Sequence, residues 1–114
     1  MSRVFVGIDI GTTNVKVAAI DEYGSPLGFY TKQTPLITIK ENWIEQSPEA
    51  WWASTANCFA QMANDHAANT AAIEGIAVSA QGTGATFVDK AGYPIHDCLI
   101  WMDRRGRWLP RQLN

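Results

Sequence analysis

The sequence predicts an α/β fold that opens with a three-stranded meander and continues with one long helix and further strands. Three observations lead to this prediction. Two apolar runs, residues 4–10 and 15–20, are separated by a short polar turn. A capped helix start follows at Ser47-Pro48, and a further apolar run, residues 73–80, follows that helix. We therefore expect strands and helix to share one core.

Composition narrows the class of protein. The chain has 114 residues, enough for one domain, and its 46% hydrophobic and 18% charged content is that of an ordinary globular protein. A net charge of −2 argues against nucleic acid or an anionic membrane as the partner. Cys58 and Cys98 lack metal-ligand spacing, so we expect reduced, packed thiols in a cytoplasmic protein. Asp9 interrupts the first apolar run, which argues against a secretory signal or a membrane span.

The first three strands are expected at Val4–Ile10, Val15–Ile20 and residues 27–33. Gly11 gives the backbone freedom for the tight first turn, and "DEYGSP" marks the second. The segment Thr34–Gln46 contains Pro35 and little apolar alternation, and we expect it to be mostly loop.

The helix has the clearest start signal in the chain. Ser47 suits the N-cap, Pro48 the first helical position and Glu49 the positive end of the helix dipole. The helix is expected to end near His66. Its core-facing stripe is predicted from the spacing i, i+4, i+7 and i+11, which gives Trp52, Ala56, Phe59 and Ala63.

Beyond the helix we expect a strand at residues 73–80, a tight "QGTG" loop, a strand at 85–89 and a short buried strand within 98–103. A helix is expected to begin after "CLIWMDRR". The last residues do not resemble a finished domain edge, so we expect the sequence to be part of a longer protein.

The turn between the first two strands carries the most chemistry. Backbone N–H groups of a glycine-containing turn converge into an anion site, and the hydroxyls of Thr12 and Thr13 add donors for phosphate oxygens. Asp9 could hold a magnesium ion through water, and Lys16 could reach the same charge. A plain polar hairpin turn stays an equal alternative from this stretch alone.

Two further stretches suit a polyol. Gln81 and Thr83 offer an amide and a hydroxyl, and Gly82 and Gly84 let a ligand approach closely; the alternative is an ordinary glycine-rich turn. In "LIWMDRR", Trp101 offers a ring face for C–H groups and Asp103 a carboxylate for hydroxyls. Asp103 and Arg105 could equally form a structural ion pair.

Other polar residues have simpler interpretations. His66 and His96 have no catalytic partner in the sequence and are expected at the surface or at a cap. The four arginines of the carboxyl-terminal stretch are expected on a solvated helix face, at positions Arg104, Arg105, Arg107 and Arg111.

Four motifs in order, D-x-G-T-T, W-x-E-Q-x-P-x-x-W-W, "GIAVSAQGTG" and W-x-D-x-R, span essentially all 114 residues. Together they resemble the amino-terminal end of the FGGY carbohydrate kinases. The resemblance implies a ribonuclease H-like fold of the actin and hexokinase type. Residues 1–114 would form part of the amino-terminal domain, and the nucleotide domain would lie outside this sequence.

The resemblance also assigns roles. Asp9 matches the acid that holds Mg²⁺ and the phosphates, and the turn over the ATP phosphates is matched by Gly11, Thr12 and Thr13. Lys16 lies where members often carry a basic residue near the transferring phosphate. The sugar-facing residues are matched by Gln81, Gly82, Thr83, Trp101 and Asp103. The implied chemistry is transfer of the ATP γ-phosphate to a hydroxyl of a sugar or polyol. The general base and the adenine pocket are expected downstream, so this segment alone should be inactive, and the complete protein is expected to be a homo-oligomer.

Departures from the family pattern bear on the sugar. Glycerol kinases carry Arg-Glu directly after the glutamine of this loop, and many D-xylulose kinases carry Met-His, whereas this sequence has Gly82-Thr83. The loop looks closer to the branch that includes L-xylulose kinases, which favours a ketopentose or a related polyol.

Two other classes of protein stay open at this point. One is a stand-alone nucleotide- or partner-binding remnant that lacks catalysis. The other is an actin-like or chaperone-like ATPase with the same fold and no sugar.

Overall fold

The computed structural model describes residues 2–108, which form two compact units. The first unit runs up to Thr34 and continues over Glu49–Gln81, and the second contains Pro35–Pro48 and the residues from Gly82 onward. The expected helix start of the carboxyl-terminal stretch is present as the short 3-10 helix η2, Arg105–Trp108, whereas Arg111 lies outside the described residues.

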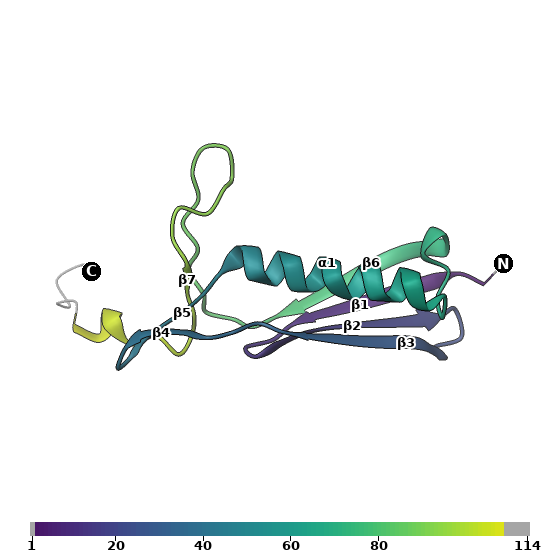
Figure 1. The fold of residues 1–114 in the computed structure, drawn as a ribbon, viewed down its shortest axis with the longest axis horizontal. Coiled ribbons are helices and arrows are strands. Elements are labelled where there is room, and N and C mark those ends of the chain that lie inside the picture. The colour runs from purple at the N-terminus through teal and green to yellow at the C-terminus, as the bar shows by residue number, and fades with distance from the viewer. Residues whose placement is uncertain (1, 109–114) are drawn as a thin grey trace. The chain divides into compact units, whose positions relative to one another are not determined.

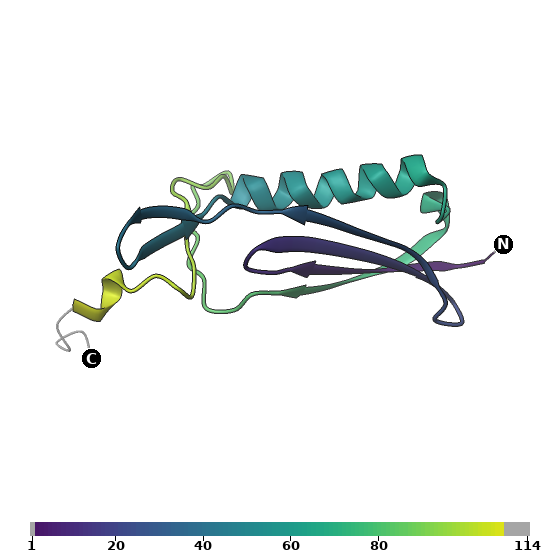
Figure 2. The same cartoon turned by 60° about the horizontal axis from the view of Figure 1, so that its bottom comes forward.

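The first unit is a four-stranded sheet in the order β3-β2-β1-β6. Its strands are β1 Val4–Ile10, β2 Asn14–Asp21, β3 Pro26–Gln33 and β6 Ile73–Ala80. The first three form the predicted antiparallel meander, and β6 pairs with β1 in parallel. Figure 2 shows the ends of β1 and β6 pointing the same way. A parallel pair needs a long crossover, which here contains the helix α1, Pro48–Asp65, and the short 3-10 helix η1, Thr70–Ala72.

Helix α1 lies along one face of this sheet (Figure 1). Alternate residues of β1 and β2 point toward it and are buried, among them Val4, Val6, Val15 and Val17. The other face of the sheet carries Asp9 and Lys16, which face away from the helix because side chains alternate along a strand.

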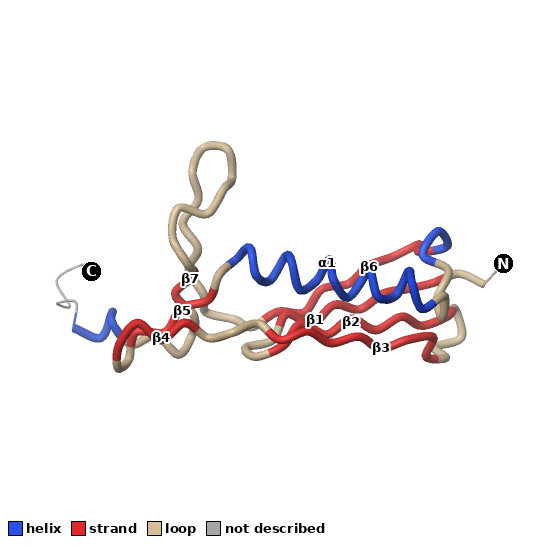
Figure 3. Tube along the Cα trace, viewed as in Figure 1, coloured by secondary structure: helices blue, strands red, loops and turns tan. Residues whose placement is uncertain are grey.

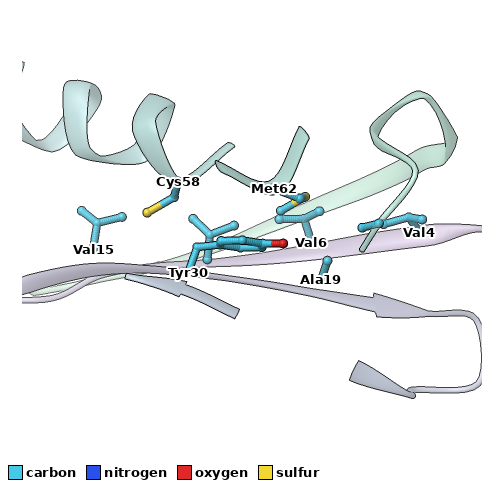
Figure 4. Packing of buried hydrophobic residues seen from close by; sticks show 9 residues of the cluster. Val4, Val6, Val15, Ala19, Tyr30, Cys58 and Met62 are labelled. Atoms are coloured by element: carbon cyan, nitrogen blue, oxygen red, sulfur yellow. The ribbon is translucent and has the colours of Figure 1, made fainter. Parts of the chain in front are cut away.

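The predicted helix boundaries are confirmed at Pro48 and within one residue at the carboxyl end, but the predicted stripe is wrong. The buried helix residues are Ser54, Cys58 and Met62, with Phe59 packed beside them, whereas Trp52 is 75% exposed. Figure 4 shows Cys58 and Met62 directed at the sheet residues. The space between the helix and the sheet is filled by the smaller side chains of Ser54 and Cys58 and the flexible side chain of Met62.

Tyr30 is the aromatic centre of this core and lies on β3. Its hydroxyl donates a hydrogen bond of 3.0 Å to Asp65 Oδ2 at the end of α1. Burial, followed by this bond to Asp65, raises the pKa of Tyr30. Gly28 leaves room for the ring, since a Cβ there would lie 2.6 Å from the tyrosine hydroxyl oxygen.

The second unit holds a three-stranded sheet in the order β4-β5-β7. Its strands are β4 Ile37–Lys40, β5 Trp43–Gln46 and β7 Cys98–Leu99 (Figure 3). The expectation of a loop at Thr34–Gln46 is therefore wrong, because β4 and β5 form a hairpin there. The expected strand at 85–89 is reduced to isolated bridges, from Ala85 to Leu99 and from Val88 to Pro94.

Both cysteines are free and buried, as predicted. Burial raises the pKa of the Cys58 thiol. No helix among residues 2–108 has both the length and the apolar character needed to cross a bilayer.

Candidate functional site

The turn between β1 and β2 is closed by backbone hydrogen bonds. Gly11 N–H donates to Asn14 O over 3.0 Å, and Thr34 N–H donates to Thr13 O over 2.9 Å. A Cβ at Gly11 would lie 3.0 Å from Asn14 O, so a larger residue at this position would require the turn backbone to shift. Thr12 is partly buried and Thr13 is exposed. The predicted turn is therefore a tight structure that presents hydroxyls at its tip.

Asp9 lies at the carboxyl end of β1, where it faces Lys16 of β2 in antiparallel register and Ser79 of β6 in parallel register. These three residues line one open hollow of about 420 Å³ on the helix-free face of the sheet. Among residues 2–108, no hydrogen bond or ion pair is made by the Asp9 carboxylate. A carboxylate and an amine are thus held side by side at the mouth of the turn, and the carboxylate is available to a ligand.

Gln81 follows β6 directly and reaches the same turn. Its backbone N–H donates a hydrogen bond of 2.8 Å to Ile10 O. Its side-chain Nε2 donates a longer bond of 3.4 Å to Gly11 O. The parallel pairing of β6 with β1 causes this approach, because both strands end at the same edge of the sheet. Two motifs that are 70 residues apart in sequence therefore meet in one place.

The loop after Gln81 is strained at one residue. Thr83 has a φ of 55°, in the left-handed region that costs a β-branched residue about 1–2 kcal/mol. A Cβ at Gly82 would meet no atom within 4 Å, so there is open space beside this residue. Strain and open space in one short loop are typical of a binding segment.

In the second unit, Trp101 is half-exposed within the turn that follows β7, and Asp103 is nearly buried. The Asp103 carboxylate accepts hydrogen bonds from the Ile44 N–H (2.8 Å) and from Arg105 N–H and Nε. The side-chain hydrogen bond from Arg105 is the main reason that the pKa of Asp103 is lowered. The ion pair that the sequence left open is confirmed.

Glu45 was not identified from the sequence. It lies on β5, it is buried, and its Oε1 accepts a 2.7 Å bond from Arg105 Nη2. The expectation that all four arginines lie on a solvated face is therefore wrong for Arg105, since Glu45 and Asp103 hold it; Arg104 and Arg107 are exposed. The only sequence signal was an acidic residue inside an aromatic motif, and the arginine that pairs with it is 60 residues away.

The two histidines lie at a helix end and in a loop of the second unit. His66 is exposed and adopts a left-handed backbone conformation just after α1, which agrees with the predicted cap. The Nδ1 of His96 lies 2.7 Å from Asp97 O, and its Nε2 lies 3.8 Å from Glu45 Oε1. Among residues 2–108 there is no cluster of three or more histidine, cysteine or acidic side chains that could hold a metal ion.

Comparison with known proteins identifies the family of this chain. A model of the amino-terminal domain of the FGGY family of carbohydrate kinases matches residues 4–114. A xylulose kinase of Staphylococcus epidermidis is 26% identical over all of this chain and 23% of its own length. A glycerol kinase of Marinomonas is 30% identical over 92% of this chain and 22% of its own length.

Solved structures show the same similarity. The crystal structure described as a xyloylose kinase from Brucella ovis matches 91% of this chain and 22% of its own, with a TM-score of 0.87 and 30% identity. A glycerol kinase of Plasmodium falciparum, at 19% identity and a TM-score of 0.80, shares the fold. This chain thus spans about a fifth of the length of its relatives. The actin- and hexokinase-like fold is confirmed, and the chain belongs to the FGGY family of carbohydrate kinases, matching its amino-terminal domain.

Proposed function

We propose that the complete protein transfers the γ-phosphate of ATP to a hydroxyl of a sugar or polyol, and that this segment supplies the phosphate turn and the acceptor loop. The observation that carries the proposal is the contact between Gln81 and the turn at Gly11. Phosphoryl transfer needs the acceptor and the phosphate in line and close together, and most of its catalysis is positioning and charge stabilisation.

On the phosphate side, Thr12 and Thr13 would donate to phosphate oxygens, and Lys16 would offset negative charge. Asp9 fits a Mg²⁺ site because its carboxylate is uncommitted among residues 2–108 and lies beside the turn. Protein-bound Mg²⁺ typically uses one or two carboxylates together with water and substrate phosphates, so a single acid suffices here. When bound, the ion would neutralise part of the negative charge on the phosphate oxygens.

On the acceptor side, Gln81 would bind a sugar hydroxyl through its amide, and Thr83 through its hydroxyl. Gly82 leaves the space that the sugar needs, and the half-exposed ring of Trp101 offers an apolar face for sugar C–H groups. The general base that takes the proton of the attacking hydroxyl and the adenine pocket would come from sequence beyond this segment.

The sugar proposed is a ketopentose or a related polyol. Gly82-Thr83 stands where glycerol kinases are expected to carry Arg-Glu, so the loop lacks the charged pair of that branch. Curated relatives with significant similarity include proteins named xylulose kinase and glycerol kinase. Between a ketopentose and glycerol as the acceptor, the resemblance of "SAQGTG" to the L-xylulose kinase branch favours the ketopentose.

The direct experiment measures ADP release by the complete gene product with ATP and Mg²⁺, with and without each member of a panel of ketopentoses, other ketoses and polyols. We expect release only with a sugar or polyol, and fastest with a ketopentose. Thr13→Val should reduce turnover at least about tenfold because it removes one phosphate donor. Thr31→Val is the matched control, since Thr31 is an exposed strand residue outside the turn.

If no compound in the panel stimulates ADP release, the kinase proposal is overturned. Sugar-independent ATP hydrolysis would instead favour an actin-like or chaperone-like ATPase. The cytoplasmic location and the homo-oligomeric state of the complete protein also stay predictions, which cell fractionation and sedimentation would check.

A further inference from the structure

We propose that Arg105 is a positioning residue for the sugar: its guanidinium fixes both Asp103 and Glu45 and so presets the turn that presents Trp101. This inference rests on the proposed function. It adds a role for the β4–β5 hairpin and for an arginine that the motif alone left on a solvated face.

The guanidinium forms a fork between two carboxylates. Its Nε lies 3.0 and 2.9 Å from the two Asp103 oxygens, and its Nη2 lies 2.7 Å from Glu45 Oε1 and 2.7 Å from Asp103 Oδ2. Both acid side chains are 5% exposed, and Arg105 is 21% exposed. Charge-assisted bonds of this kind are stronger than neutral ones, and a partly desolvated site screens them less than open solvent does.

The same guanidinium also contacts an aromatic ring. Arg105 Cζ lies 4.3 Å from the centre of the ring of Trp43, the first residue of β5. A flat guanidinium can bind two carboxylates and contact a ring at once, whereas a lysine ammonium is a point charge that cannot reproduce this arrangement. The site therefore requires an arginine and not simply a positive charge.

The two carboxylates that Arg105 binds are connected to the two ends of the turn that carries Trp101. Upstream of it, Leu99 pairs with Glu45 of β5 and exchanges two backbone hydrogen bonds with Ala85, of 3.0 and 3.1 Å. Downstream, Asp103 N–H donates to Ile100 O over 2.9 Å, and the Asp103 side chain accepts from Ile44 of β5. Both ends of the turn are thus attached to the β4–β5 hairpin. Downstream, the bond from Arg104 N–H to Asn42 O (2.8 Å) joins two main chains, whereas the bond to Ile44 depends on the carboxylate that Arg105 holds.

Loss of Arg105 would weaken the side-chain part of this attachment, the bond from Ile44 N–H to Asp103. Two nearly buried carboxylates would be left without their shared cation. Their mutual repulsion and the cost of burying unpaired charges would favour conformations in which both are exposed to water. Among residues 2–108, the basic side chains of His96 and Lys40 also lie near these residues but are poorly placed to replace Arg105: His96 Nε2 is 3.8 Å from Glu45 Oε1, and Lys40 lies over the Trp43 ring. The Trp101 turn would loosen, and the sugar site would lose its ordered ring face.

The experiment compares Arg105→Gln and Arg105→Lys with wild type in the complete gene product, by kcat and by KM for the preferred sugar and for ATP. A loosened binding turn should raise the sugar KM about tenfold in Arg105→Gln and leave the ATP KM within about twofold. Arg105→Lys should show most of this effect, because the ammonium keeps the charge and loses the fork. Arg107→Gln is the matched control in the same 3-10 helix, since Arg107 is exposed, and it should behave as wild type.

Glu45→Gln covers the case in which the Arg105 variants do not fold. It keeps the shape and an oxygen that accepts from Arg105, removes one charge, and should raise the sugar KM by a smaller factor, about threefold. Equal changes in the sugar and ATP KM values, or an unchanged sugar KM in all three variants, would overturn the inference while the kinase function stands. A wild-type protein that no sugar stimulates would overturn both.

Discussion

Replacing Asp9 with asparagine should separate catalysis from stability. The carboxylate makes no hydrogen bond or ion pair among residues 2–108, and its main neighbour is Lys16 across the strand pair. An opposite-charge cross-strand pair contributes about 0.2–1 kcal/mol, so Asp9→Asn should lower the free energy of unfolding by less than about 1 kcal/mol. The amide keeps the size of the side chain and opens no cavity.

The effect on turnover should be far larger. If Asp9 holds Mg²⁺ and the phosphates, its loss removes one of the groups that stabilise charge in the transition state. Losses of a single such group cost about 10²- to 10³-fold in kcat, or about 2.7–4 kcal/mol. The measurement is coupled ADP release at saturating sugar with varied Mg²⁺ and ATP, beside denaturant unfolding of the same preparation.

The matched control is Asp21→Asn at the far end of the same hairpin. The Asp21 carboxylate accepts hydrogen bonds from Tyr23 N–H (2.9 Å) and Ser25 N–H (2.8 Å), and the Ser25 bond is the main reason that its pKa is lowered. This variant should lose stability and keep wild-type turnover. A wild-type kcat in Asp9→Asn would remove Asp9 from the phosphate site, and a loss of stability well above 1 kcal/mol would show a structural carboxylate instead.

Three further predictions test the core and the helix end. Met62 is fully buried, so Met62→Ala should cost about 2–5 kcal/mol in denaturant unfolding, and a loss under 1 kcal/mol would show that the site collapses around the gap. His66 has a φ of 55° just after α1, so His66→Gly should raise the free energy of unfolding by about 1 kcal/mol, and a drop in Tm would contradict this. Tyr30→Phe should cost about 1 kcal/mol at pH 7. Because the Tyr30 pKa is raised on folding, its contribution is complete below the usual pKa near 10 and is lost as the pH rises through the folded value. The variant should therefore show a flatter alkaline decline than wild type, and identical declines would exclude Tyr30 as the titrating group.

The strand meander, the helix start and the tight turn between β1 and β2 could be predicted from sequence because their signals are local. Gly11 and the two threonines lie between two apolar runs, and Ser47-Pro48 is a complete capping signal within two residues. The joining of Gln81 to this turn could not be predicted from periodicity. It depends on the parallel pairing of β6 with β1, which is a long-range contact.

The errors also have physical causes. The predicted helix stripe followed the bulk of Trp52, whereas Ser54 is buried because its hydroxyl donates a 3.2 Å bond to Gln33 O on β3. The hairpin of β4 and β5 escaped prediction because its polar side chains hide the alternation. One of them, Glu45, is buried only through an arginine far along the chain. Such burial becomes visible only when the distant partner is placed.

The backbone hydrogen bond between Gln81 and Ile10, beside the proposed phosphate turn, has a consequence for how the acceptor loop can vary. The 2.8 Å bond from Gln81 N–H to Ile10 O joins two main chains, so it does not depend on which side chain occupies position 81 or its neighbours. If residues 82 and 83 contact the acceptor as proposed, substitutions there can change the acceptor preference while the loop keeps its attachment to the hairpin. Related proteins with different acceptors would then share the same attachment between this loop and the proposed phosphate turn.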